Sequence, residues 1–445
     1  MEFLNQLVSD ISSFVWGVPM LTLLVGTGLF LTIRLKGLQF WAMGHAFKLI
    51  MKDEKDAKGD ISHFQALMTA LAATVGIGNI VGVATAITFG GPGAVFWMWV
   101  TGLVGMATKY SEAILAVKYR QEGTNGYKGG PMYYLAHGLN MPKLGYAFAF
   151  FTVLASFGIG NMTQANSISH AIFSQFAIEP WISGIILLTI TSFVILGGIK
   201  SIGKTTSILI PFMIVVYIVT ALVIILTNLD KVGGAFGLIF YHAFNPIAAG
   251  GGFIGAAVAA AIRYGIARGV FSNESGLGSA PIAAAAAKTD DPVKQALVSM
   301  TQTFIDTLVV CTMTAVIILM APVWTTGGSA GELTLKSFEF FLGSSGAYII
   351  VLATILFGYS TILGWSYYGE RAFEYIFGEK SIKIYRVVFV SFVLIGSMLE
   401  LKFVWNFSDM ANGLMAIPNL IALLLLSKVV AQETDRYFDA KKSLK

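Results

Sequence analysis

The chain has 445 residues, of which 56% are hydrophobic and only 12% are charged, and its formal net charge is +5. Soluble proteins are about 25% charged and about 45–50% apolar even when glycine is included. In this chain 48 glycines come on top of the hydrophobic residues. So few charges could not cover a soluble domain of this size, which argues against the water-soluble enzyme classes. We therefore expect an all-α integral membrane protein.

Each membrane-spanning helix needs about 20 mainly apolar residues. Eleven stretches meet this requirement, and the seventh is too long for one straight helix. The runs are continuously apolar rather than alternating, which excludes a membrane β-barrel. In chain order the eleven predicted transmembrane helices lie at about 14–33, 64–89, 93–117, 146–173, 181–198, 205–228, 250–289, 295–322, 346–369, 384–401 and 404–427.

The distribution of Lys and Arg gives the orientation, because cytoplasmic connections carry the excess of positive charge. The connection 34–63 is basic, and so is every second connection after it. The intervening connections hold only Lys231, Lys336 and Lys402. We expect a multi-pass protein of the cell (plasma) membrane with its N-terminus outside and its C-terminus in the cytoplasm. The positive net charge then reflects topology and indicates no nucleic-acid partner.

Without the first span, ten spans remain, which divide into five and five. An odd number of spans in each half gives the halves opposite orientation, an inverted-topology repeat. The predicted organisation is an extra N-terminal transmembrane helix (1–36), a cytoplasmic amphipathic connection (37–63), a first five-helix repeat (64–230), a second, inverted repeat (250–430) and a cytoplasmic tail (431–445).

Two glycine-interrupted segments lie at matching places in the two halves, at 75–79 and at 271–278. At such a break, freed N–H groups can hold a carboxylate and freed carbonyls can hold Na⁺ or an ammonium group. A single glycine pair can equally serve close helix packing. Two symmetric clusters that each contain an asparagine favour discontinuous helices around a transport site.

At these residues the chain resembles the alanine or glycine:cation symporter family over nearly its full length. The resemblance rests on the segments 76–84, 90–110, 129–134 and 271–276. It implies the five-plus-five leucine-transporter fold of the amino acid-polyamine-cation superfamily, and a prokaryotic source. It also implies alternating-access symport (uptake) of alanine, glycine or similar small neutral amino acids, driven by Na⁺ or alternatively by H⁺.

The segment Val75–Asn79 is similar to the unwound first helix of sodium symporters, and this likeness implies residue roles. The amides of Ile77 and Gly78 would hold the substrate carboxylate, while the Thr74 carbonyl and the Asn79 side chain would meet the amine or a cation. The remaining substrate-binding candidates from the resemblance are Gly76, Phe271, Ser272, Asn273, Gly276 and Gln164. At the position of Gln164 those sodium symporters carry a tyrosine. The implied Na⁺ ligands are the carbonyls of Ala72 and Val75 and the hydroxyls of Ser360 and Thr361.

Other candidates come from polar or aromatic residues inside predicted spans. The run Phe157–Asn166 is polar on more than one face, so Asn161 and Phe157 are predicted to line the site beside Gln164. Trp365, one turn beyond Thr361, is a candidate for one wall of the pocket. Helix-to-helix hydrogen bonding and simple packing are the alternatives for these residues.

Ionisable groups at membrane depth are costly and indicate functional sites. Glu274 is a candidate for proton linkage or for holding the unwound segment, and Asp306 for a cation or proton site or for a buried ion pair. Arg268 is a candidate for an external gate or for snorkelling to the surface. Lys109 and Glu112, three residues apart, are expected to form a structural ion pair.

No signature of an enzyme is present. The five histidines fit no metal spacing, and the sequence contains no His-Glu-x-x-His, Gly-x-Ser-x-Gly or Walker motif. We expect no cofactor apart from Na⁺ as coupling ion. The expected partners are the small amino acid, Na⁺ or H⁺ and the lipid bilayer, with no nucleic acid and no obligate protein partner. A membrane channel or receptor is the less favoured alternative.

Overall fold

The computed structural model describes residues 2–52, 57–124, 126–245, 254–325 and 330–443. Helices dominate these ranges. The strands β1 (Gln121–Gly123) and β2 (Gly126–Lys128) pair antiparallel as a short hairpin.

The helices follow one another along the chain with short connections. Several begin with proline in their first turn, where the missing N–H costs nothing, as in the helices that start at Pro142, Pro180 and Pro292. The first half contains α1 (Glu2–Val15), α2 (Val18–Arg34), α3 (Leu38–Trp41), α4 (Met43–Ile50), α5 (His63–Thr74), α6 (Val81–Gly90), α7 (Ala94–Lys118), α8 (Pro131–Tyr133), α9 (Pro142–Phe157), α10 (Thr163–Phe176), α11 (Pro180–Ile195), α12 (Gly198–Thr227) and α13 (Leu229–Phe244). The second half contains α14 (Ile254–Asn273), α15 (Pro281–Ala284), α16 (Pro292–Thr303), α17 (Thr312–Met320), α18 (Ala330–Leu342), α19 (Ser344–Phe377), α20 (Ile382–Met398), α21 (Leu401–Leu425) and α22 (Ser427–Ser443).

Among the described residues, six helices are long and apolar enough to cross a membrane, or up to seven if α1 and α2, bent by 45°, form one span. Two further apolar helices, α6 and α11, are shorter than such a span. The multi-pass, all-helical prediction is confirmed at this level, whereas the number of eleven spans and the inverted repeat remain predictions.

Two predicted spans extend beyond their apolar cores. α9 and α10 join through a π-helical stretch, Gly158–Met162, so that one helix runs from Pro142 to Phe176. α19 continues to Phe377, two turns past the predicted end at residue 369. It can do so because its terminal charges are paired: Arg371 lies within ion-pair distance of Glu370 and of Glu374.

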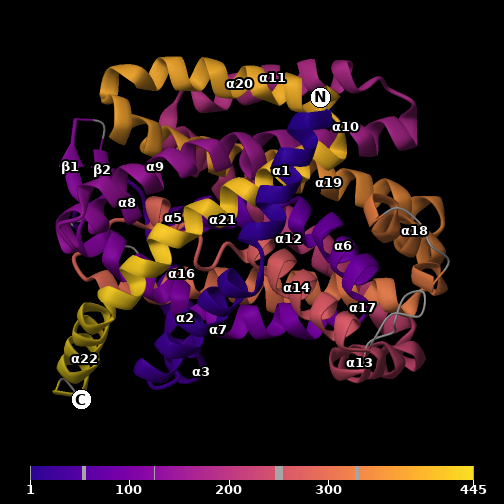
Figure 1. The fold of residues 1–445 in the computed structure, drawn as a ribbon, viewed down its shortest axis with the longest axis horizontal. Helices are drawn as coiled ribbons and strands as arrows, with labels where there is room; N and C mark the ends of the chain where they lie inside the picture. The colour runs from indigo at the N-terminus through magenta and orange to yellow at the C-terminus, as the bar shows by residue number, and fades with distance from the viewer. Residues whose placement is uncertain (1, 53–56, 125, 246–253, 326–329, 444–445) are drawn as a thin grey trace.

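Opposite ends of the molecule carry different short elements (Figure 1). The hairpin β1–β2, α8 and the C-terminal α22 lie at the left end of the view, whereas α13 and α18 lie at the right end. α11 and α20 run side by side along one long edge. The interrupted helices α5–α6 and α14–α15 therefore run between two ends, with α16, α17 and α19 packed around them.

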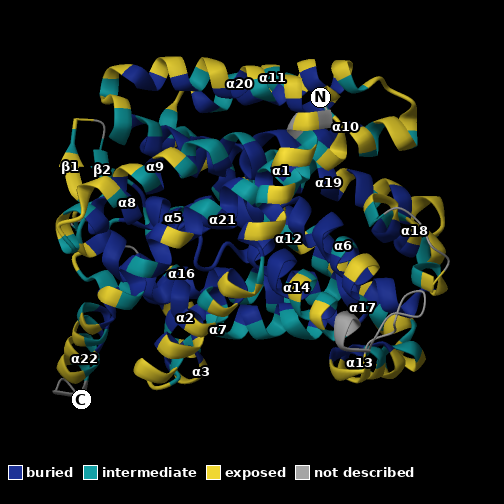
Figure 2. Cartoon of the chain, in the orientation of Figure 1, coloured by how far each residue is buried: buried dark blue, intermediate teal, exposed yellow. Residues whose placement is uncertain are grey.

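Burial divides the helices into an inner and an outer group (Figure 2). In α12 only 28% of the apolar segment is buried, and large apolar side chains such as Phe193, Ile208 and Val387 are exposed on α11, α12 and α20. In α19 and in α16–α17 the buried share is 67%. An apolar exterior around a polar-containing interior is the arrangement expected of a protein in lipid.

Candidate functional site

The first predicted break is confirmed. α5 ends at Thr74, and α6 begins only at Val81. Between them the backbone is extended at Gly76 (φ −137°, ψ −152°) and then makes a 3₁₀ turn over Ile77–Asn79. Asn79 Oδ1 accepts a hydrogen bond from the Gly76 N–H at 2.9 Å. The asparagine thus satisfies one of the backbone donors that the interruption frees.

Gly76 lies in close contact with two other helices. The next amide, the N–H of Ile77, donates to Gln164 Oε1 on α10 at 3.2 Å. A Cβ added to Gly76 would overlap with Thr361 Oγ1 on α19 and lie 3.3 Å from Gln164 Oε1. Glycine is therefore required here for close approach, and the break brings together predicted substrate and sodium residues.

The second break begins later than predicted. Phe271, Ser272 and Asn273 still belong to helix α14, and α15 starts at Pro281. The non-helical segment opens at Glu274, whose φ of +57° is unusual for a residue with a side chain. It continues through Gly276, at φ +90°.

Two charged residues of α7 hold this segment. Glu112 Oε1 accepts hydrogen bonds from the N–H groups of Gly276 (3.1 Å) and Gly278 (3.2 Å). Lys109 Nζ donates to the Glu274 carbonyl at 3.1 Å. Lys109 and Glu112 make no direct ion pair, so the predicted pairing is wrong. Both residues instead satisfy backbone groups of the unwound chain, a role that membrane burial makes necessary.

The Glu274 carboxylate points into the protein interior and has two donors. Trp365 Nε1 donates to Oε1 and Ser279 Oγ donates to Oε2, both at 2.6 Å. Glu274 and Trp365 are fully buried. The tryptophan that was predicted as a pocket wall is thus fixed in place by the second break.

Asp306 joins the two interrupted helices. Asn79 Nδ2 donates to Asp306 Oδ1 at 2.7 Å, and Ser272 Oγ donates to Oδ2 at 2.9 Å. Thr307 Oγ1 supplies a third donor at 2.8 Å. Asp306 lies in a π-helical stretch, Phe304–Cys311, and such stretches often occur at functional sites.

Backbone and hydroxyl oxygens converge between α5 and α19. Ser360 Oγ lies 3.3 Å from the carbonyl oxygen of Ala72 and 3.4 Å from that of Val75. Oxygens at this spacing fit around a small cation with metal–oxygen bonds of about 2.3–2.6 Å. Thr361 Oγ1 belongs to the next residue of α19 and faces Gly76.

Aromatic and charged groups close one side of α14, the first part of the second interrupted helix. Arg268 Nη2 donates to Asp409 Oδ2 on α21. The Arg268 guanidinium also lies 5.3 Å from the ring centre of Phe271 and 5.0 Å from that of Trp405. The Phe271 and Trp405 rings are stacked, with centroids 4.7 Å apart. Arg268 is buried and paired, so the snorkelling alternative is wrong.

Two predicted pocket residues are not brought to the breaks. Asn161 Nδ2 donates to the Phe389 carbonyl at 2.6 Å, and Phe157 packs against Phe389 and Phe392 of α20. Both therefore serve the contact between α9–α10 and α20. Asn273 lies at the break, but its side chain is already hydrogen-bonded within the protein, since it accepts from the Ser275 N–H and donates to Thr307 Oγ1.

Several residues of the site were not predicted. Gln302 Nε2 donates to Thr74 Oγ1 at 3.0 Å, and Cys311 Sγ lies 3.2 Å from Asn79 Nδ2. Asn419 Nδ2 donates both to Glu112 Oε1 (2.7 Å) and to the Gly276 carbonyl (2.9 Å). A polar side chain within an apolar span was the available signal for Gln302 and Asn419.

Comparison with known proteins places this geometry in context. The full chain, residues 1–445, matches the sequence model of the sodium:alanine symporter family. It is 54% identical to the sodium/alanine symporter AgcS of Methanococcus maripaludis, over 100% of this chain and 99% of that protein. It is 38% identical to the probable sodium/glutamine symporter GlnT of Bacillus subtilis, over 99% of this chain and 92% of that protein.

A solved structure shows the same fold. The crystal structure of MhsT in complex with L-phenylalanine matches with a TM-score of 0.64, covering 85% of this chain and 93% of MhsT. The sequence identity is 15%, so the match concerns the fold alone. The predicted leucine-transporter-like architecture agrees with this match.

Proposed function

Because the chain belongs to the sodium:alanine symporter family, we propose that it imports a small neutral amino acid such as alanine or glycine together with Na⁺. Members of this family are transporters and not enzymes. The observation that carries the proposal is the meeting of the two interrupted helices, where a Cβ on Gly78 would lie 3.0 Å from the Ser272 Cα. AgcS, named for sodium and alanine, supports the choice of substrate.

The substrate carboxylate would bind the amides of Ile77 and Gly78. At present Gln164 Oε1 accepts from the Ile77 N–H, so it stands where a carboxylate oxygen would lie. On binding, the Gln164 side chain would rotate and its Nε2 would donate to the carboxylate. The ammonium group would meet the Thr74 carbonyl and Asn79 Oδ1. Every one of these contacts is an amide, carbonyl or side-chain amide, which suits a zwitterion without further charge.

The substrate side chain would be limited in size. Phe271 and Trp365 are both buried, and each is held by further contacts, to Trp405 and to Glu274 respectively. Fixed aromatic walls leave room for a methyl group more readily than for a long side chain. We expect glutamine to compete weakly with alanine, although a relative is named for glutamine.

The coupling Na⁺ would bind the carbonyls of Ala72 and Val75 and the hydroxyls of Ser360 and Thr361. The two carbonyls end the first half of the broken helix, where the helix dipole is negative. Among the described residues no group of three or more His, Cys, Asp or Glu is placed to hold a metal ion. An uncharged set of oxygens fits a monovalent cation better than a divalent one.

Replacing Ser360 by alanine is expected to raise the Na⁺ concentration for half-maximal uptake by about ten- to hundredfold. The reason is that a polar contact to a charged group contributes about 1.5–3 kcal/mol. The rate at saturating Na⁺ should change little. Ser366→Ala is the matched control, because Ser366 is buried on the same helix and donates only to the Leu363 carbonyl. An unchanged Na⁺ dependence in Ser360→Ala would remove the sodium assignment.

Alternating access requires that each side of the site can close. We propose that Arg268 and Asp409 form the outer gate, with the stacked Phe271 and Trp405 beneath them, at the side of the molecule that carries α13 and α18. In the proposed orientation this side is extracellular and the hairpin end is cytoplasmic.

Replacing Asp409 by asparagine is expected to weaken outer closure, because loss of one partner of a buried pair costs about 3–5 kcal/mol. Alanine binding from outside should persist while the initial rate of uptake falls about tenfold or more. Asp230→Asn, which neutralises an exposed acid of α13, serves as control. Uptake at the parental rate in Asp409→Asn would exclude the gate.

Uptake by purified protein in proteoliposomes tests the function as a whole. We expect labelled alanine to accumulate under an inward Na⁺ gradient and not when choline replaces Na⁺. Accumulation that persists in choline would remove the sodium claim, and an imposed pH gradient would then test the H⁺-coupled alternative. Absence of uptake for alanine, glycine and other small neutral amino acids would refute the proposal.

A further inference from the structure

The two interrupted helices are also joined at the hairpin end of the molecule. The segment that leads into α5 pairs with the segment that follows α15, as a parallel bridge between Ile61 and Ala287. The Asp60 N–H donates to the Ala286 carbonyl at 2.8 Å, and the Lys288 N–H donates to the Ile61 carbonyl at 2.7 Å. Backbone hydrogen bonds therefore join the two interrupted helices on this side of the breaks.

Arg120, just after α7, closes this contact. Its Nη1 donates to the carbonyls of Ala285 (3.1 Å) and Ala287 (2.7 Å). Its Nη2 donates to the carbonyls of Lys58 (2.9 Å) and Thr289 (2.8 Å). One guanidinium thus binds four carbonyl oxygens from both segments. The planar fork of arginine can do this, whereas the single ammonium of lysine cannot.

The hairpin β1–β2 covers the guanidinium. The Tyr127 ring centre lies 4.5 Å from the Arg120 guanidinium carbon, a favourable cation–π distance. The Tyr127 N–H donates to Asp60 Oδ2 at 2.7 Å. The hairpin is therefore attached to the segment before α5 as well as to Arg120.

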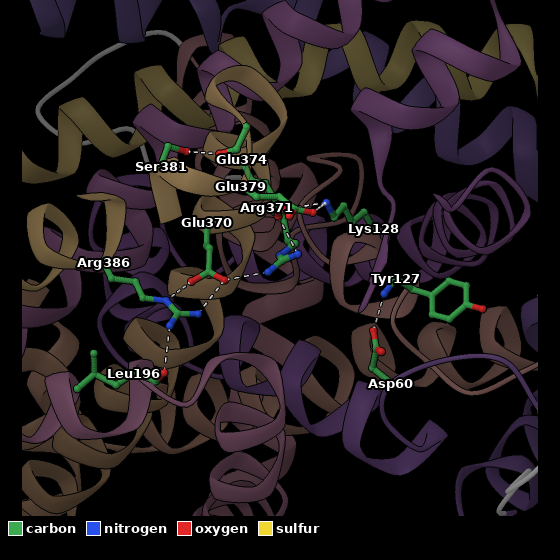
Figure 3. Close-up of polar contacts among 11 residues, drawn as sticks. Asp60, Tyr127, Lys128, Leu196, Glu370, Arg371, Glu374, Glu379, Ser381 and Arg386 are labelled. Carbon is green, nitrogen blue, oxygen red and sulfur yellow. Dashed lines mark hydrogen bonds and ion pairs between the residues drawn. The ribbon is translucent and has the colours of Figure 1, made fainter. Parts of the chain in front are cut away.

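Lys128 attaches the same hairpin to the end of α19 (Figure 3). Lys128 Nζ lies 2.7 Å from Glu374 and 2.5 Å from Glu379. Burial works against the charged form, but the hydrogen bonds to both glutamates raise the pKa of Lys128 above its ordinary value. The hydrogen bond from Lys128 lowers the pKa of Glu379. The link is thus charged at neutral pH.

We propose that Arg120 is the positioning residue of the inner gate, holding the proposed cytoplasmic ends of both interrupted helices together while the hairpin ties them to α19. This inference rests on the proposed function, because only a transporter needs this side to open. Opening requires Arg120 to release one segment, and it can give up the single Lys58 carbonyl before α5 while it keeps the three carbonyls after α15. The guanidinium is only half-buried, so water can replace the released carbonyl, which makes the contact reversible.

Thiol labelling measures the opening directly. A cysteine replaces Ala66, which is 1% exposed on α5, and a membrane-impermeant maleimide is added to inside-out vesicles. A second reporter, Ser167→Cys, lies in the 340 Å³ cavity at the opposite, α18 end. The parent without either reporter measures labelling of the native, buried Cys311.

Arg120→Ala is expected to raise the rate of labelling at position 66 about tenfold. The rate at position 167, measured with the maleimide applied from the α18 end, should not rise. Arg120→Lys should give a smaller rise at 66. Lys118→Ala, which removes a neighbouring basic side chain paired with Glu433, should leave both rates within about twofold. Sodium-dependent alanine binding should persist in Arg120→Ala while uptake falls.

Equal rises at both reporters would indicate general loosening and would overturn the proposal, as would unchanged labelling at position 66. If Arg120→Ala yields no monodisperse protein, Arg120→Lys and Asp60→Ala decide by the same readout, since Asp60→Ala frees the hairpin from the segment before α5. The labelling result is separate from the proposed function, which fails only if the parent itself shows no sodium-driven uptake.

Discussion

Replacing Gly76 by alanine is expected to lower the initial rate of sodium-driven alanine uptake by about a hundredfold or more. The new methyl group would overlap with Thr361 Oγ1 and lie 3.3 Å from Gln164 Oε1. Overpacking of this kind costs about 1–3 kcal/mol, and a hundredfold change corresponds to about 2.7 kcal/mol. The displaced groups are those proposed to bind Na⁺ and the substrate carboxylate. The half-saturation concentrations of Na⁺ and of alanine should therefore rise together.

Gly82 offers the matched control on the same interrupted helix. A Cβ at Gly82 would meet no atom within 4 Å, so Gly82→Ala should keep uptake within about twofold of the parent. The two variants are compared in proteoliposomes at equal protein content. Parental activity in Gly76→Ala, or an equal loss in both variants, would refute the assignment of the first break as the binding site.

The contrast between these two glycines indicates why the first break could be predicted from the sequence. Its geometry is local: Gly76 supplies the close approach, and Asn79, three residues later, accepts from the Gly76 N–H. All the residues that interrupt the helix lie within one short stretch. A glycine followed by an asparagine three residues later is therefore enough to predict where this helix is interrupted.

The start of the second break could not be predicted in the same way. Phe271, Ser272 and Asn273 remain helical, and the chain unwinds at Glu274 because Lys109 binds its carbonyl and Glu112 binds the amide of Gly276. These partners lie on α7, some 165 residues earlier in the chain. Tertiary hydrogen bonds of this kind leave no local signature.

In the helix that runs from Pro142 to Phe176, the side chains do not all face the side that a regular helix predicts. Gln164 reaches the first break, whereas Asn161 and Phe157 contact α20. The π-helical stretch Gly158–Met162 lies between Phe157 and Gln164 and departs from the regular 3.6-residue turn. A π-helical turn contains more residues, so side chains beyond it are rotated relative to those before it. Positions assigned by a regular helical repeat then fall on the wrong face.

Replacing Asp306 is expected to give the other large effect, a loss of coupling between ion movement and amino-acid accumulation. The carboxylate is fully buried and accepts from Asn79, Ser272 and Thr307. No Lys or Arg of the described ranges forms an ion pair with it. A charge held at membrane depth by neutral donors alone is a site where a cation or proton can bind. Because its donors come from both interrupted helices, such binding would depend on the same arrangement as substrate binding.

Asp306→Asn keeps the size of the side chain and removes its charge. If one coupled cation or proton binds there, its loss removes about 2.3 kcal/mol at 100 mV, and the accumulation ratio should fall about fiftyfold. Exchange of internal for external alanine, which needs no net ion movement, should persist. Thr314→Val is the control, since Thr314 lies on the same membrane helix but contacts Tyr217.

Measuring accumulation under separate Na⁺ and pH gradients identifies the coupled ion. If Asp306 binds a second Na⁺, the variant should lose steepness in its Na⁺ dependence while its response to pH stays as in the parent. If the residue carries a proton, the response to a pH gradient should disappear and the Na⁺ dependence should stay. Parental accumulation and an unchanged response to both gradients would leave Asp306 with hydrogen bonding between the helices as its role. In that case coupling would rest on the oxygens of Ala72, Val75 and Ser360.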